Sequence, residues 1–287
     1  MAIASPGIIK AANDALVEIR PAINVVKQFA FDLSGEFATP GTTVKVPVAS
    51  TGAIAEFDRD SNNFETADGS LSWETVTLDQ TVKSTFQIKS QDMLDAPMNS
   101  YWATISKASA NAVNKFISDK IGALFNATTL TNKTVQTGDL TAKKAAKFRT
   151  ACEGRVDETV LILKPDWYAD VLGDLDSSAY GNANPFHNGK VDGLFGFAAV
   201  VEGRSLPDGV NGVLLPKDCL VTATRAYQFP APEGYLECGD VRDEETGFAL
   251  TAMRHIDPAT GDMFLNLISL WGLKLIQTGK ITLISAS

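Results

Sequence analysis

The most constraining feature of this sequence is a long excursion, residues 41–88, whose two ends are both patterned as strands. Over 42–48 three valines alternate with Thr, Lys and Pro, and over 82–88 Val82, Phe86 and Ile88 alternate with polar residues. Alternation with a period of two is typical of a half-buried strand. We therefore expect 82–88 to return along 42–48 as the second limb of a long antiparallel arm.

An arm of this length cannot bury itself on its own chain. A lone two-stranded ribbon is marginally stable in water and gains stability by packing on something else. Between the two limbs, clusters of turn-forming residues at 50–52, 60–63 and 67–70 indicate a tip and two bends. The chain is therefore predicted to need neighbours.

The charges of the arm suggest what such a neighbour offers. Residues 51–79 hold seven acidic residues and the single base Arg59, whereas residues 97–153 hold eight basic residues and three acidic ones. The arm is either a solvated surface loop or a segment that lies on a basic surface of another subunit, where complementary patches set register and encounter rate. The candidate contact residues are Glu56, Asp58, Arg59, Asp60, Glu65 and Asp68 in the arm, and Lys107, Lys115, Lys120, Lys143, Lys144 and Lys147 outside it.

The remaining chain alternates helical and strand patterns. Apolar residues at spacings of three and four predict one long amphipathic helix over 97–126. Ser5-Pro6 begins an N-terminal helix that ends before Pro21. The other predicted elements are helices at 22–33, 141–155 and 165–172, strands at 159–163 and 194–201, and a closing strand meander that includes 263–276.

Composition excludes several classes of protein. With 287 residues, 45% of them hydrophobic, the chain has enough material for a sizeable core. The net charge of −9 argues against a surface that binds nucleic acid throughout. The N-terminus lacks a secretory signal pattern, which indicates cytosolic synthesis, and polar residues interrupt 263–276, so no membrane span is predicted. Cys152, Cys219 and Cys238 are odd in number and widely spaced, as expected of free, buried thiols.

The sequence also lacks the usual motifs of catalysis. His187 and His255 have no Cys, His or carboxylate at zinc-ligand spacing, and no nucleophile elbow, phosphate loop or dinucleotide fingerprint is present. Asp243-Glu244-Glu245 is interpreted as an exposed acidic turn, which does not suit general acid catalysis. We therefore predict no catalytic, cofactor-binding or metal-binding residues.

The order of these parts resembles a known family. A buried strand at 160–163 leads to Lys164-Pro165-Asp166-Trp167, and Leu194-x-Gly196 then precedes Val200-Val201 and Leu206-Pro207. This order is similar to that of the major capsid proteins of tailed bacteriophages with the HK97-like fold. The resemblance implies an α+β fold with an N-terminal arm (1–40), an extended loop (41–88), a peripheral domain with a spine helix at 97–126 (89–138), an axial domain (139–222) and a peripheral strand meander (223–287).

The same resemblance implies a structural role. Copies would assemble as hexamers and pentamers into an icosahedral shell around double-stranded DNA, in a virion made in the host cytoplasm. A portal protein would be a partner, and the absence of a long charged leader implies a separate scaffolding protein. Because no lysine lies between Ser50 and Gln80, a covalently crosslinked shell is not expected. An encapsulin-type nanocompartment is the alternative; a small hydrolase or a surface adhesin would need catalytic residues or a secretion signal.

Overall fold

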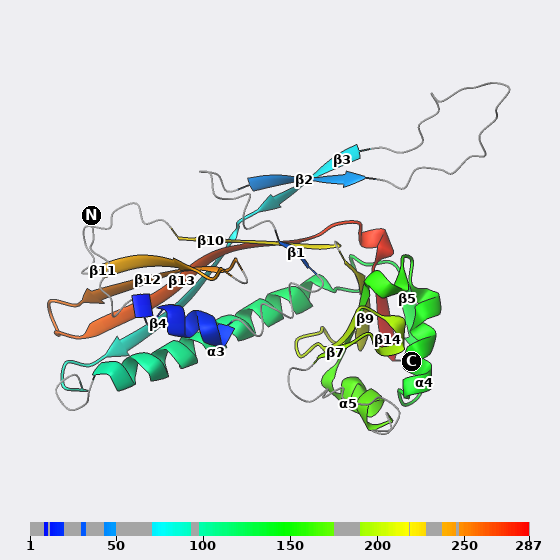
Figure 1. The fold of residues 1–287 in the computed structure, drawn as a ribbon, viewed down its shortest axis with the longest axis horizontal. Helices are drawn as coiled ribbons and strands as arrows, with labels where there is room; N and C mark the ends of the chain where they lie inside the picture. Colours follow the sequence, from blue (N-terminus) through cyan, green and yellow to red (C-terminus); the bar gives the residue numbers. More distant parts are fainter. Residues whose placement is uncertain are drawn as a thin grey trace.

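The computed structural model describes residues 9–10, 12–19, 30–32, 43–49, 71–92, 98–174, 190–217, 219–227, 237–244 and 247–286. Within them the chain forms two bodies and a projecting ribbon (Figure 1). The first body is an extended sheet flanked by one long helix. The second is a compact sheet with two shorter helices, and the ribbon leaves the first body near the junction between the two.

The first sheet has a long central strand, β13 (Met263–Leu275). One edge of β13 pairs along its length with β4 (Gln80–Ile88), and the other edge pairs with β12 (Ala249–Ile256) and then with β10 (Leu220–Ala226). The short strand β1 (Ala30–Asp32) is parallel to β10, and β11 (Glu237–Arg242) is antiparallel to β12. The strands β12 and β13 are thus the closing meander that the sequence predicts.

The long helix α3 (Met98–Leu124) confirms the prediction for 97–126. Its buried residues recur at helical spacing and join one apolar cluster with the first sheet, where the ring of Phe116 meets that of Trp271 edge-on at 6.4 Å. Residues 12–19 are also helical, which agrees with the predicted N-terminal helix, and they pack into the same cluster. The buried apolar side chains in the described part of α3 include Ile105, Ala110, Val113, Ile117 and Ile121.

The second sheet has the order β5-β14-β9-β6-β8-β7. Its strands are β5 (Lys133–Gln136), β14 (Thr282–Ala286), β9 (Gly212–Pro216), β6 (Thr159–Leu163), β8 (Ala199–Glu202) and β7 (Lys190–Asp192). All five residues of β6 are buried, as the run of apolar residues predicts. Because successive side chains of a strand point to opposite faces, Val160 and Ile162 join the cluster of α3, while Leu161 and Leu163 join a second cluster.

Two helices cover that second face. The helix α4 (Ala142–Lys147) begins at Thr141, whose hydroxyl accepts the backbone N–H of Lys144. The helix α5 (Pro165–Gly173) begins with a proline in its first turn, as predicted. The helix expected over 141–155 is shorter than expected, because the chain tightens into a 3-10 turn at Phe148–Ala151 and then leaves helical geometry at Cys152.

Three strand or helix predictions are wrong. Strand β4 does not return along 42–48; it pairs with β13, and Val82 and Ile88 are buried in the first body. Residues 30–32, expected to be helical, form β1, while the rest of the predicted helix 22–33 lies outside the described residues. The strand expected from 194 begins only at Ala199, because positive φ at Gly193 and Phe195 turns the preceding residues into a 3-10 helix, Leu194–Gly196.

The chain crosses between the bodies after β13. Residues Thr278–Lys280 form a 3-10 turn, after which β14 lies between β5 and β9 of the second sheet. The last strand therefore leaves the meander of the first body and hydrogen-bonds in the second (Figure 1).

Candidate functional site

The projecting ribbon consists of β2 (Thr43–Ala49) and β3 (Leu71–Thr77), paired antiparallel. The end of the ribbon nearest the first sheet belongs to a small separate apolar cluster, in which Val46, Val76 and Leu78 pack against Val221 of β10 and Ile276. The ribbon is therefore fixed to the first sheet at its base, and its two strands project from that sheet (Figure 1).

Two residues of β13 hold the base of the ribbon in place. Gly272 lies so close to the backbone at Thr77 that a Cβ on it would be 2.4 Å from the Thr77 carbonyl oxygen. Two positions further on, Lys274 Nζ donates to Glu74 Oε2 at 2.8 Å and to the Thr75 carbonyl oxygen at 2.9 Å. Since neighbouring Trp271 faces α3, Gly272 and Lys274 face the other way, and the ribbon crosses the sheet on the side opposite α3.

The ribbon presents an apolar face to solvent. Pro47 and Trp73 are directly paired across its two strands, and Ala49 is paired with Leu71. Trp73 is 61% exposed and Leu71 is 60% exposed, which is unusual for large apolar side chains on one face of a sheet. Neither residue is among the predicted contact residues, although the alternation of Leu71 and Trp73 with Ser72 and Glu74 predicts a strand with one apolar face.

The predicted acidic contact residues cannot be placed in the structure. Glu56, Asp58, Arg59, Asp60, Glu65 and Asp68 all lie outside the described residues.

The predicted basic residues are described, and the structure divides them between two places. Lys107 and Lys115 are exposed on α3, and the Lys120 ammonium lies over the Phe116 ring at 5.3 Å from its centre. Lys143 and Lys147 are exposed on α4. Because α3 flanks the first sheet, where it contacts β4 and β13, and α4 covers one face of the second sheet, the two groups of lysines lie on different bodies.

Lys144, the sixth of the predicted basic residues, forms hydrogen bonds within its own chain. Lys144 Nζ donates to the carbonyl oxygens of Thr137 and Asp139 at 3.0 and 2.8 Å. It thereby holds the turn around Gly138, which has a φ of 67°.

The two bodies meet closely at one point of α3. The Ser205 hydroxyl donates to Asp119 Oδ1 at 2.7 Å, and the Ser205 carbonyl oxygen lies where a Cβ on Gly122 would be, 1.8 Å away. A glycine on this face of the helix is what lets the loop after β8 reach the helix backbone. The relative position of the bodies is therefore set by direct contact between α3 and that loop.

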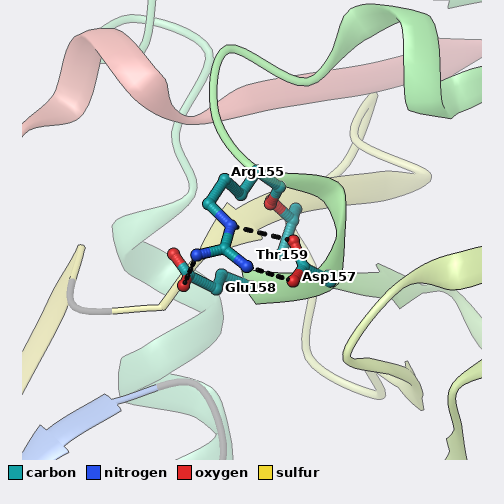
Figure 2. Close-up of polar contacts among 4 residues, drawn as sticks. All are labelled: Arg155, Asp157, Glu158 and Thr159. Carbon is teal, nitrogen blue, oxygen red and sulfur yellow. Dashed lines mark hydrogen bonds and ion pairs between the residues drawn. The ribbon is translucent and has the colours of Figure 1, made fainter.

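Ionic contacts order a turn of the second body just before β6 (Figure 2). Arg155 Nη2 lies 2.6 Å from Asp157 Oδ2, and Arg155 Nη1 lies 3.0 Å from Glu158 Oε1. The hydrogen bond from Arg155 lowers the pKa of Asp157, and the Thr159 hydroxyl donates to the Arg155 carbonyl oxygen at 2.8 Å. All three charged side chains are more than half exposed, so these pairs fix the turn and contribute little to global stability.

The structure offers little that resembles a reaction centre. Within the described residues, no three His, Cys, Asp or Glu side chains gather closely enough to hold a metal ion. His187 lies outside those residues, and the His255 ring stacks on Phe264 with 4.9 Å between centres. Asp243 was expected in an exposed turn, but it is only 5% exposed because the connection between β11 and β12 folds back on it: its N–H donates to the Phe248 carbonyl oxygen.

The three cysteines are all free, as expected. Cys219 is buried, whereas Cys152 and Cys238 are only partly buried, and in both of these burial raises the pKa of the thiol. Among the described helices, none is both long and apolar enough to cross a membrane.

Comparisons with solved structures identify the class of fold that combines a sheet with a long flanking helix, a second compact sheet and a projecting ribbon. The chain is similar to the capsid of Ralstonia phage GP4, with 9% identity over 89% of this chain and 86% of that one and a TM-score of 0.57. It is also similar to the capsid of cyanophage A-1(L), with 12% identity over 92% of each chain and a TM-score of 0.55. These likenesses show the HK97-like α+β fold.

A virus-like particle from Pyrococcus furiosus has the same fold, with 10% identity over 95% of this chain and 98% of that one and a TM-score of 0.51. The family of phage capsid proteins matches residues 74–262. No curated protein sequence matches the chain. This chain belongs to the phage capsid protein family, and it is a major capsid protein, a structural component of the virion that assembles with further copies of itself.

Proposed function

We propose that this capsid protein assembles as hexamers and pentamers into a closed icosahedral shell around double-stranded DNA, with each ribbon lying over a neighbouring subunit. The observation that carries the proposal is the exposed apolar face of the ribbon, on which Leu71 and Trp73 are about three-fifths exposed in the single chain. Large exposed aromatic side chains are frequent anchors of protein interfaces, and a neighbouring copy would bury them.

We further propose which part of the chain forms the peripheral domain of a shell subunit and which forms the axial domain. The first sheet with α3 would be the peripheral domain, and the second sheet with α4 and α5 the axial domain. The hydrogen bonds of β5 and β14 to each other and of β14 to β9 support counting these two strands with the axial domain, although the family resemblance implied that 89–138 and 223–287 belong to the peripheral one. The acidic residues between β2 and β3 would then reach a basic surface of the neighbour.

The lysines of α3 are the described candidates for that basic surface, together with those of α4. Lys107 and Lys115 lie two helical turns apart on one exposed side of α3, so they could face packaged DNA or the neighbour's acidic residues. A separate scaffolding protein and a portal protein would complete the assembly. Each of these partners is a proposal for this chain.

Electron microscopy of the purified protein tests the assembly. Closed shells are expected from the wild type, and a monodisperse monomer under all salts and concentrations would overturn the proposal. The Trp73→Ala variant should lose most assembly while its monomer unfolds at the wild-type temperature, because truncating an interface anchor typically costs about 2 kcal/mol or more of binding. Thr75→Ala, also exposed on the ribbon, is the matched control and should assemble normally.

A second variant tests the acidic residues. Reversing Glu56, Asp58 and Asp60 to lysine should impair assembly while leaving the monomer folded, because like charges would then meet across the contact. Normal shells from this triple variant would show that these acidic residues do not attract a basic surface of the neighbouring subunit.

The alternative is an encapsulin-type shell that holds protein cargo, which the match to the phage capsid protein family supports less than a phage capsid. The content of shells purified from the native source distinguishes the two. Double-stranded DNA of uniform length supports the phage capsid, whereas a single enclosed enzyme without DNA would support the nanocompartment.

A further inference from the structure

The two helices of the second body carry opposite charges with the same spacing. On α4, Lys143 and Lys147 are exposed one helical turn apart, and on α5, Asp166 and Asp170 are exposed one helical turn apart. Residues four apart on a helix are neighbours, so each helix presents a like-charged pair, which is mildly unfavourable in a single chain. A partner that carries opposite charges at the same spacing would offset the repulsion within each pair.

Among the described residues, these four charges have no ion-pair partner, in contrast to other charges of the second body. Arg155 is paired with Asp157 and Glu158, and Arg204 with Glu202. Among the described residues, neither the two lysines of α4 nor the two aspartates of α5 form an ion pair. Asp174, one turn beyond Asp170, has a partner within the chain, because its carboxylate accepts the backbone N–H of Ala142 at the start of α4.

The two helices lie toward opposite edges of the same layer. The turn that follows α4 is tied to β14, where the Thr282 hydroxyl donates to the Ala151 carbonyl oxygen at 3.1 Å. The helix α5 lies against β8, where burial and, to a smaller extent, the negative charge of Glu202 raise the pKa of Tyr168 to about 12. The strands β9 and β6 separate β14 from β8, so α4 lies toward one edge of the sheet and α5 toward the other, although the two helices touch where Asp174 accepts the Ala142 N–H.

A body that is basic toward one edge and acidic toward the other suits head-to-tail contact between identical copies. Contacts of this kind, in which two different surfaces of the same chain meet, generate closed rings when the rotation between copies closes. We propose that Lys143 and Lys147 of one copy face Asp166 and Asp170 of the next copy around each ring of the shell. This inference rests on the proposed ring-forming function and adds to it the charged surfaces that join neighbours within a ring.

Two complementary charge-reversed variants test the contact. Variant A carries Lys143→Glu and Lys147→Glu, so both of its helices are acidic; variant B carries Asp166→Lys and Asp170→Lys, so both are basic. Each variant alone should yield at least about tenfold less assembled shell than the wild type, because like charges then meet at every contact. Mixing A and B should restore even-numbered rings, in which the variants alternate, and leave five-membered rings impaired.

Rescue on mixing requires that the contact is between copies, because an attraction within one chain cannot be restored by a second chain. The matched control carries Lys107→Glu and Lys115→Glu on α3, which flanks the first sheet, and variant B should not rescue any defect it has. The proposed contact is refuted if A and B each assemble like the wild type, or if mixing them does not restore the assembly of rings.

A wild type that forms no shell would instead refute the proposed function itself. Should either reversal lower the unfolding temperature of the monomer, the neutral variants Lys143→Gln with Lys147→Gln, and Asp166→Asn with Asp170→Asn, replace it. Assembly of these variants should lose much of its dependence on salt, because a screened attraction between exposed charges is what salt weakens. A salt dependence equal to that of the wild type would overturn the inference.

Discussion

Gly272 of β13 lies directly under Thr77 of β3, so close that a Cβ on the glycine would be 2.4 Å from the Thr77 carbonyl oxygen. The ribbon therefore leaves the first sheet at a point where no larger residue fits. Lys274, two positions along β13, holds the same segment through Glu74 and the Thr75 carbonyl oxygen. The close approach positions the ribbon, and the lysine restrains it.

We expect Gly272→Ala to loosen the base of the ribbon. The added methyl group must push the backbone at Thr77 away from β13, and overpacking of this kind typically costs about 1–3 kcal/mol of folding free energy. Thermal unfolding and limited proteolysis between β2 and β3 measure the effect. Gly279→Ala is the control, because a Cβ on Gly279 would have no atom within 4 Å; equal behaviour of the two variants would show that the crossing has no role.

We expect Gly122→Ala to disturb the joint between the two bodies. Alanine in place of glycine favours a helix by roughly 1 kcal/mol, but its methyl group would occupy the position of the Ser205 carbonyl oxygen. The steric conflict should dominate, so the unfolding temperature should fall. Ser205→Ala, which removes the hydrogen bond to Asp119 without adding an atom to the helix, should cost less, about 0.5–1.5 kcal/mol. A more stable Gly122→Ala variant would contradict the close approach.

Asp262 should make stability depend on pH in the acidic range. The backbone N–H of Ser90 and the side-chain amide of Gln87 donate to its carboxylate and hold the pKa of Asp262 below its ordinary value. Because the folded pKa is lowered, the stabilisation is present above the unfolded pKa of about 4 and is lost as the pH falls through the folded pKa. The wild type should therefore exceed Asp262→Asn in stability at neutral pH, and the gap should close in acid.

Urea titrations at a series of pH values measure that gap. Asp208→Asn, in an exposed turn, serves as the control for the loss of one negative charge. A gap that stays constant into the acidic range would mean that the hydrogen bonds to Asp262 do not depend on its ionisation.

Mature shells should contain no covalent crosslink from the segment between the two strands of the ribbon, because it has no lysine between Ser50 and Gln80. A boiled denaturing gel of purified shells should show a single band at the mass of the monomer, 30.7 kDa. A ladder of multimers that survives boiling would refute this prediction.

Much of the local structure could be predicted from the sequence. The helix α3, the buried strand β6 and the proline-led helix α5 were each predicted to within a few residues, because their patterns depend on neighbours three, four or two positions away. The partner of β4 was not predictable in this way. Alternation shows that one face of a strand is buried, but any strand of matching length can supply the hydrogen bonds, and here β13 does.

The candidate site, too, could be predicted from the sequence only in part. The sequence by itself determined that the arm is acidic and free of lysine between Ser50 and Gln80, and that basic residues gather after 97. Only the tertiary structure decided that the lysines of α3 and α4 lie on different bodies, that Lys144 forms hydrogen bonds within its own chain, and that Trp73 is exposed. Charge is a property of each residue, whereas the face on which it is presented depends on how distant strands form a sheet and which helices then cover it.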